Sequence, residues 1–232
     1  MVLNIMNWGK TIILVIPGGG YQHLSNRESG PISLKFNCFG YNTAILYYSL
    51  PPYEKLRPYH DGIEALEYLK TRFDNIILMG FSAGGHLAGI LGTKAYMYNV
   101  KAMVLSYPVI SLGKYTHEQT ATNFLNNEMT EELINEYSVD KCVTENTVPT
   151  FIWSTKTDEL VPIENTLMMK DALDKYNIKN ECIIYPEGPH GYALADITAY
   201  VENGPNYINE EVAKWPIFAD KFIKEVLNKE ES

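Results

Sequence analysis

The sequence predicts a doubly wound α/β domain, in which helices cover both faces of a mostly parallel β-sheet. Two observations lead to this fold class. Short runs rich in β-branched and other apolar residues alternate along the chain with longer stretches in which apolar residues recur at helical spacing. The strand-like runs are almost continuously apolar, as expected of strands that are buried on both faces. This alternation is typical of parallel sheets built from repeated strand–helix units.

The predicted elements follow in chain order. Six strands are expected over residues 11–16, 43–48, 76–79, 102–105, 149–153 and 181–185. Apolar residues at positions 59, 63, 66, 69 and 73 predict a helix over 58–73. Further helices are expected over 85–96 and 163–176, and a last one opens at Pro216, a residue suited to a first helical turn. We therefore expect a minimal sheet of about six parallel strands.

Residues 111–148 interrupt this alternation of strands and helices. The segment is polar, with short helical patches near 118–125 and 130–137. Parallel α/β domains bind ligands beyond the carboxyl ends of their strands, so one interpretation is a cap-like insertion over that edge of the sheet. A plain surface insertion explains the same composition equally well.

The composition is that of a single globular domain spanning residues 1–232. Hydrophobic residues make up 46% and charged residues 20% of the chain, and the net charge is −9. This charge argues against a nucleic-acid partner. The amino-terminal residues lack the basic segment and cleavage site of a signal peptide, and the early apolar run over 12–16 is too short to span a membrane.

Three widely spaced cysteines fit reduced thiols, so we expect a cytoplasmic protein. The sequence contains no HExxH motif and no Cys/His cluster, so neither a metal nor another cofactor is expected. The sequence is compatible with a homo-oligomer but does not fix the oligomeric state.

The strongest local signal is Gly80-Phe81-Ser82-Ala83-Gly84, which matches the pattern G-x-S-x-G. A predicted strand precedes it and a predicted helix follows, as the nucleophile turn of serine hydrolases requires. Glycines are needed at both ends because side chains there would collide with the neighbouring strand and helix. The turn exposes the Ser82 hydroxyl at a helix N-terminus, where negative charge is favoured. Ser82 is therefore the candidate nucleophile.

A serine needs a base, and in this class of turn the acid and then the histidine follow the serine in the chain. His190 lies in a loop beyond the last predicted strand, from which it can reach the turn. His23, His60 and His86 break the order or follow the serine too closely, and His117 has no strand before it. We expect His190 to be the base and His86 to be a packed, hydrogen-bonded residue.

The acid must follow a strand between Ser82 and His190. The loop beyond the predicted strand 149–153 offers Asp158 and Glu159. We favour Asp158, which stands just before the helix that Pro162 opens, while Glu159 fits a solvated loop residue. Asp158 would hold the tautomer of His190 and stabilise its protonated form.

An oxyanion hole needs a second backbone N–H besides that of Ala83. The glycines after the first predicted strand can approach a substrate closely, so the N–H groups of Gly19 and Gly20 are both candidates. Tyr21, beside them, is a candidate substrate-binding residue. A nucleotide-binding loop is a poor alternative, because neither a Walker lysine nor G-x-G-x-x-G is present.

Together these motifs resemble those of a known family, the small bacterial α/β-hydrolase esterases related to acetylxylan esterases and described as sugar hydrolases or endo-xylanase-B-like proteins. The resemblance covers about residues 10–190. It is carried, in order, by Pro17-Gly18-Gly19-Gly20-Tyr21, Ser25-Asn26-Arg27-Glu28, Gly80-Phe81-Ser82-Ala83-Gly84-Gly85-His86-Leu87-Ala88, Asp158-Glu159-Leu160-Val161-Pro162-Ile163-Glu164-Asn165 and Gly188-Pro189-His190-Gly191.

The resemblance implies a serine carboxylesterase that removes small acyl groups, above all acetyl, from sugars or similar alcohols through an acyl-enzyme. It places the nucleophile at Ser82, the acid at Asp158 and the base at His190. One departure is Pro17, which stands where the longer esterase motif has a histidine.

Two other functions are alternatives to the esterase for this sequence. A prolyl-oligopeptidase-like peptidase shares the order of the three residues, but that class carries a propeller or large cap for which we see no room. A non-catalytic binding protein on a hydrolase scaffold is disfavoured because Ser82, Asp158 and His190 are all present.

Overall fold

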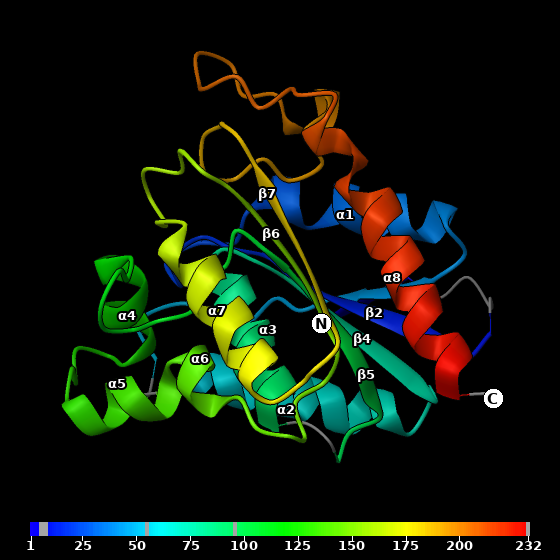
Figure 1. Cartoon of the computed structure of the whole chain (residues 1–232), viewed down its shortest axis with the longest axis horizontal. Coiled ribbons are helices and arrows are strands. Elements are labelled where there is room, and N and C mark those ends of the chain that lie inside the picture. The colour runs from blue at the N-terminus through cyan, green and yellow to red at the C-terminus, as the bar shows by residue number, and fades with distance from the viewer. Residues whose placement is uncertain (5–8, 54–55, 95–96, 231–232) are drawn as a thin grey trace.

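The computed structural model describes residues 1–4, 9–53, 56–94 and 97–230. A seven-stranded sheet in the order β1-β3-β2-β4-β5-β6-β7 runs through the molecule, with helices on both faces (Figure 1). Six of its strands are parallel: β2 (Thr11–Ile16), β3 (Asn42–Ile45), β4 (Asn75–Phe81), β5 (Val100–Ser106), β6 (Thr150–Thr155) and β7 (Asn180–Tyr185). The expected α/β fold and its parallel strands are thus confirmed.

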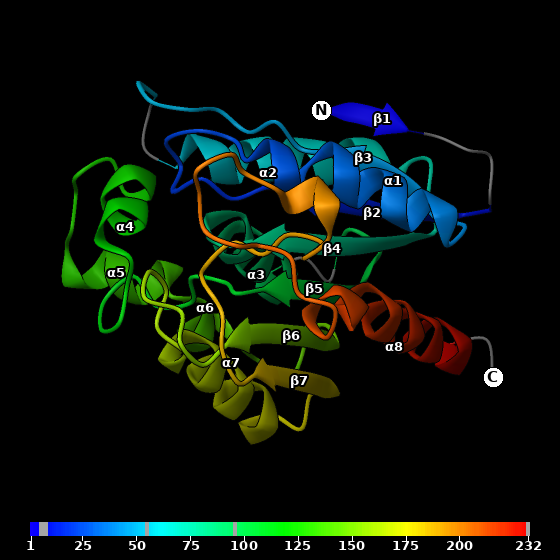
Figure 2. The ribbon, with the colours of Figure 1, turned by 90° about the horizontal axis from the view of Figure 1, so that it is seen from above.

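The seventh strand was not expected. β1 (Val2–Asn4) pairs antiparallel with β3 at one edge of the sheet, with Val2 opposite Ile45. Three residues are too few to give an alternating pattern in the sequence. Figure 2 shows the arrow of β1 running against those of β6 and β7.

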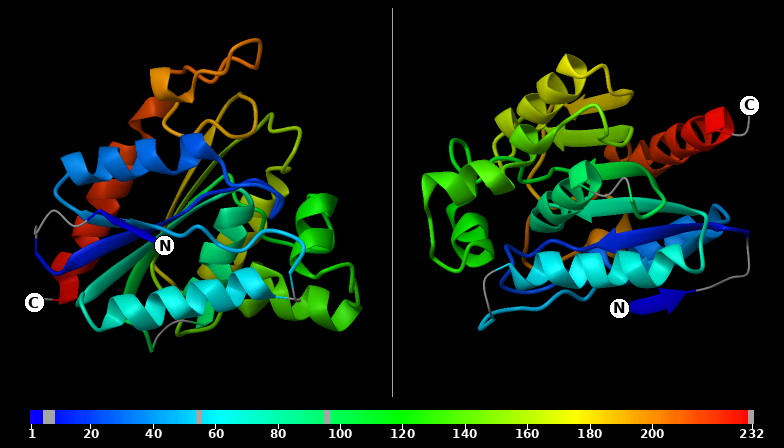
Figure 3. Two further views of the ribbon diagram at one scale, coloured as in Figure 1. Left: turned by 180° about the vertical axis from the view of Figure 1, so that it is seen from behind. Right: turned by 90° about the horizontal axis from the view of Figure 1, so that it is seen from below.

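Two layers of helices bury the sheet. On one face lie α1 (Gly30–Cys38) and α8 (Trp215–Glu230), and Figure 3 shows them side by side. On the other face lie α2 (Arg57–Lys70), α3 (Ala83–Lys94) and α7 (Glu164–Lys175). The helix expected over 85–96 corresponds to α3, although residues 95–96 lie outside the described part of the chain.

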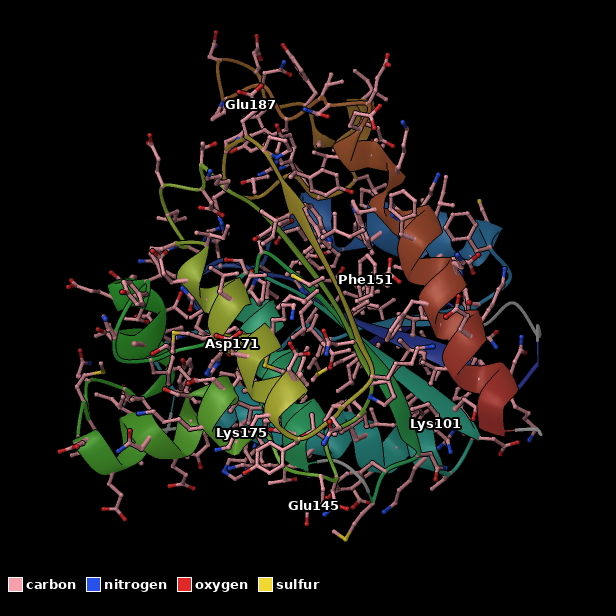
Figure 4. All side chains as sticks on the ribbon, viewed as in Figure 1. Lys101, Glu145, Phe151, Asp171, Lys175 and Glu187 are labelled. Carbon is pink, nitrogen blue, oxygen red and sulfur yellow. The ribbon has the colours of Figure 1, made fainter. Side chains whose placement is uncertain are left out.

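Each layer has its own apolar core, as the alternation of side chains along a strand requires. Ile13, Val15 and Phe151 point to the α1/α8 side, where the rings of Phe151 and Phe222 lie 6.0 Å apart. Ile12, Leu14 and their neighbours pack against α2, α3 and α7. Figure 4 shows Phe151 in the interior, whereas charged residues such as Glu187 lie at the periphery.

Residues 111–148 form three short helices, α4 (Glu118–Phe124), α5 (Glu131–Tyr137) and α6 (Val139–Cys142). In Figure 2, α4 and α5 lie beyond the carboxyl ends of β6 and β7. The loops that follow β2, β4, β6 and β7 meet at this same edge, because parallel strands end together. Among the described helices, none is both long and apolar enough to cross a membrane.

Candidate active site

The turn between β4 and α3 holds Ser82 in a strained conformation. Its φ is +53°, in the left-handed region that side chains other than glycine rarely adopt. A Cβ on Gly80 would lie 2.3 Å from the Gly84 carbonyl oxygen, and a Cβ on Gly84 would lie 2.1 Å from that of Ile16. Both glycines are therefore required for the backbone to make this turn. Ser82 is 8% exposed and lines the main cavity of the protein.

His190 and Asp158 are brought to Ser82 by the loops after β7 and β6. Nδ1 of His190 donates to Oδ2 of Asp158 at 2.6 Å, and Nε2 lies 2.8 Å from the Ser82 hydroxyl oxygen. Since a carboxylate only accepts, the proton of neutral His190 sits on Nδ1 and Nε2 accepts from Ser82. This is the tautomer that a general base needs.

The two adjacent acids, Asp158 and Glu159, lie in different environments. The side chain of Asp158 is fully buried, and its Oδ1 accepts hydrogen bonds from the N–H groups of Leu160 and Val161, both at 2.9 Å. Its carboxylate therefore has no freedom to turn away from His190. Glu159 is exposed and faces the cavity.

The loop after β2 packs directly on the nucleophile turn. A Cβ on Gly18 would lie 2.8 Å from Cβ of Ser82. Gly19 and Gly20, with φ of +124° and +62°, line the cavity with Ser82. Within the described residues, the backbone N–H groups of Gly19, Gly20 and Ala83 donate to no protein acceptor. These three donors are thus free to bind a ligand at the site.

A buried carboxylate that our sequence analysis assigned no role supports this loop. Glu28 is 3% exposed; its Oε2 accepts from the Gly18 N–H at 2.9 Å and its Oε1 from the Tyr107 hydroxyl at 2.8 Å. The Tyr107 hydroxyl in turn accepts from the N–H of Ala193, three residues after His190. Burial, and then the charge of Glu28, raise the pKa of Tyr107 well above its ordinary value, so that it remains a donor. Glu28 therefore links the loop after β2, which contains Gly18, Gly19 and Gly20 (the glycine loop), to the loop after β7, which contains His190 (the histidine loop).

Arg27 fastens the histidine loop from the same segment. Its Nη1 donates to the carbonyl of Gly191 at 2.9 Å, and its guanidinium lies over the ring of Tyr207, 4.0 Å from the centroid. The signal for both residues was Ser25-Asn26-Arg27-Glu28, which sequence analysis noted only as part of the family resemblance. A hydrophobic pattern could not have identified them, because their partners are 10 to 180 positions away in the chain.

The expectation that Tyr21 contacts the substrate is wrong. Its φ of +57° turns the ring beneath the loop, where it is fully buried against Tyr48 and Phe124. Its hydroxyl donates to Nδ1 of His86, whose Nε2 donates to the carbonyl of Tyr137, each at 2.8 Å. Tyr21 therefore supports the loop from inside the protein. His86 is a packed, hydrogen-bonded residue, as expected.

The cavity in front of Ser82 has a volume of about 710 Å³, and polar side chains share its lining with Leu160, Pro189, Pro205 and Tyr207. Besides the loops described above, His117 and Gln119 of the 111–148 segment contribute to it. We did not expect His117 to act as the base, and no pattern in the sequence indicated that it would reach the site. In the described part of the chain, no group of three or more His, Cys, Asp or Glu side chains is placed to hold a metal ion.

Comparisons with known proteins agree with this fold. The chain is 31% identical over 214 residues to endo-1,4-beta-xylanase B of Butyrivibrio fibrisolvens, covering 81% of this chain and 33% of that protein. It is 33% identical over 198 residues to an acetylxylan esterase of Xylanibacter ruminicola, covering 78% of this chain and 41% of that protein. The chain thus spans between a third and two fifths of the length of these relatives.

One of several solved structures that match almost the whole chain has the same fold. It is that of an acetyl ester-xyloside bifunctional hydrolase from Caldicellulosiruptor lactoaceticus, with a TM-score of 0.83, 31% identity and coverage of 97% of this chain and 86% of that one. The family model BD-FAE matches residues 7–173. The chain is therefore a member of the BD-FAE family of α/β-hydrolases.

Proposed function

We propose that the protein is a serine carboxylesterase that removes small acyl groups, above all acetyl, from sugars or similar alcohols. The observation that carries the proposal is the unbroken series of hydrogen bonds from Asp158 through His190 to Ser82. Gly19 and Gly20, whose N–H groups have no protein acceptor among the described residues, line the same cavity, and Ala83, whose N–H is likewise free, directly follows Ser82. A nucleophile, its base and donors for an oxyanion are the parts that acyl transfer needs.

In the first half of the reaction, Nε2 of His190 takes the hydroxyl proton of Ser82 as the oxygen attacks the ester carbonyl carbon. The carbonyl oxygen becomes an oxyanion, which the N–H of Ala83 and that of Gly19 or Gly20 stabilise. Protonated His190 then gives its proton to the alcohol oxygen, the ester bond breaks, and the acyl group remains on Ser82. Throughout, Asp158 stabilises the charge on His190.

In the second half, water replaces the alcohol. His190 takes a proton from the water as it attacks the acyl carbon, and the same N–H donors stabilise the second oxyanion. The bond to Ser82 then breaks, the serine regains its proton from His190, and the carboxylic acid leaves. The strained turn keeps Ser82 in place through both halves.

Polar side chains at the cavity offer hydrogen-bond partners to a polar alcohol. The cavity is lined by polar side chains of Gln22, Arg27, His117, Gln119 and Glu159. The names of relatives, an acetylxylan esterase and an acetyl ester-xyloside hydrolase, point to the same kind of substrate. Acetyl esters of sugars are therefore the substrates we expect.

Cleavage of a glycosidic bond has less support. It needs two carboxyl groups that flank the bond. Among the described residues, the carboxylates that line the cavity are Glu28 and Glu159. Both oxygens of Glu28 already accept hydrogen bonds, from Gly18 and Tyr107, so this residue cannot serve as an acid or base.

The test is a panel of esters and one amide with the purified protein. We expect p-nitrophenyl acetate and acetylated methyl xyloside to be hydrolysed, p-nitrophenyl octanoate to be slower in kcat/KM, and a proline anilide to be left intact. Faster cleavage of the octanoate would move the protein towards lipases. Cleavage of the anilide alone would indicate a peptidase, and no turnover of any compound would refute the proposal.

A further inference from the structure

His117 stands at the active-site cavity, as His23 does, without a part in the acyl transfer described above. It precedes α4, lines the cavity together with Ser82 and His190, and is partly buried. Its Cε1 lies 3.8 Å from where a Cβ on Gly20 would be, so the ring packs beside the glycine loop. Its position raises the question of what this imidazole does.

The protonation of His117 follows from its neighbour Thr120. Nδ1 of His117 and the hydroxyl of Thr120 are 2.8 Å apart, and Thr120 is fully buried. Within the described residues, Nδ1 is the one acceptor within reach of that hydroxyl. Because a buried hydroxyl must donate its hydrogen somewhere, it donates to Nδ1, and the proton of the neutral ring sits on Nε2.

Nε2 of His117 is thus a hydrogen-bond donor with no protein partner among the residues that the structure describes. Burial, followed by the proximity of His190, lowers the pKa of His117, while Asp158 opposes this shift. The ring therefore stays neutral at neutral pH. It offers a donor at the cavity without adding a second positive charge beside His190.

The cavity continues past His117 on the side away from Ser82. A second hollow of about 510 Å³ shares His117, Gln119, Glu159 and Leu160 with the first. Its other lining residues are Thr116, Glu118 and Thr122, so its walls are rich in hydroxyl, amide and carboxylate groups. Apart from Leu160, a substrate that extends from Ser82 in this direction meets polar groups, which suit the alcohol part of a sugar ester.

We propose that His117 is a specificity-determining residue: its Nε2–H donates a hydrogen bond to a hydroxyl that neighbours the ester on the alcohol part of the substrate. The inference rests on the proposed esterase function and adds to it the chemical feature that is recognised, an ester with an adjacent free hydroxyl. Thr120 is the positioning residue that fixes the tautomer. Such a contact favours substrates that carry the hydroxyl over analogues that lack it.

The test compares two acetates that differ by a single hydroxyl, trans-1,2-cyclohexanediol monoacetate and cyclohexyl acetate. We expect the wild-type protein to prefer the diol monoacetate in kcat/KM by about fivefold to tenfold, the value of one neutral hydrogen bond. His117→Ala should bring the two values to within about twofold of each other. His117→Gln, which keeps an N–H donor, should retain part of the preference.

Two variants of Thr120 test whether its hydroxyl fixes the tautomer of His117. Thr120→Val lacks the hydroxyl and should lose most of the preference, whereas Thr120→Ser keeps the hydroxyl and should preserve it. A merely structural role of Thr120 would change both acetates alike. As a control, His60→Ala removes an exposed histidine on α2 and should leave both rates unchanged.

Failure of the inference is distinguishable from failure of the proposed function. If the wild-type protein cleaves both acetates without preference, or if His117→Ala lowers both rates by the same factor, His117 does not read the hydroxyl and the inference is wrong. If neither these acetates nor p-nitrophenyl acetate is cleaved, the esterase proposal fails and the inference fails with it.

Discussion

Replacing Asp158 by asparagine should abolish most of the activity without unfolding the protein. The carboxylate accepts three hydrogen bonds: from Nδ1 of His190 on one oxygen, and from the N–H groups of Leu160 and Val161 on the other. An amide of the same shape has one oxygen and one NH₂ group. Whichever way it turns, its NH₂ group faces a donor.

The orientation that leaves fewer donors unpaired keeps the amide oxygen on the two backbone N–H groups. The NH₂ group then faces Nδ1 of His190, which must give up its hydrogen to accept. The proton moves to Nε2, which can no longer take the proton of Ser82. In the serine-protease case this wrong tautomer costs about 10⁴ in turnover, or about 5.4 kcal/mol in the activation free energy. We expect a loss of that order here.

The assay is kcat/KM on p-nitrophenyl acetate, with the thermal midpoint as a check on folding. The matched control is Glu159→Gln, the same change at the adjacent, exposed acid, which should cost less than about threefold. Equal losses in the two variants, or a larger loss in Glu159→Gln, would refute the assignment of Asp158. A loss of less than about tenfold in folded Asp158→Asn would refute the tautomer argument.

Two further predictions concern buried groups around the site. Glu28→Gln places an NH₂ group against either the Gly18 N–H or the Tyr107 hydroxyl. We therefore expect kcat on p-nitrophenyl acetate to fall by about tenfold or more, and the free energy of unfolding to fall by about 1–3 kcal/mol. Unchanged kcat would show that the glycine loop does not depend on this carboxylate. Burial lowers the pKa of His86 to about 4, below the 6.5 of the unfolded chain, so the folded state resists protonation. Unfolding free energies from urea titrations should therefore be highest above pH 6.5 and fall by on the order of 3 kcal/mol between pH 6.5 and 4 through this residue alone. His86→Asn should be less stable but lose less stability over the same interval, and an equally steep loss in both proteins would contradict the assignment.

Much of the fold could be predicted because its signals are local. β2 and β4 are short apolar runs ended by glycine turns, and α2 carries apolar residues at helical spacing. The antiparallel strand β1 could not be predicted, because three residues carry no periodicity and its partner β3 lies some forty residues further along the chain. The helical patches near 118–125 and 130–137, which correspond to α4 and α5, were likewise local signals, but their placement was not.

The same distinction holds at the site. Ser82 and His190 could be placed at the site because each follows a predicted strand, Ser82 in the G-x-S-x-G turn and His190 in the next loop after the last strand. The burial of Tyr21 was missed because it depends on a positive φ at that residue, which sequence does not encode for a tyrosine. His117 was missed because its place at the cavity results from how α4 packs on the glycine loop, where Asn123 donates to the Gly20 carbonyl at 2.7 Å.

Labelling with an activated alkylphosphonate ester, followed by peptide mapping, tests whether Ser82 is the nucleophile. We expect one stable adduct on the peptide that contains Ser82, and none in Ser82→Ala. That variant should also lose activity on p-nitrophenyl acetate by on the order of 10⁶ and unfold at nearly the wild-type temperature. The control Ser154→Ala, which removes a buried hydroxyl without a partner in the described structure, should label and turn over as the wild type does. An adduct on any other residue, or more than a tenth of the activity in Ser82→Ala, would show that Ser82 is not the nucleophile.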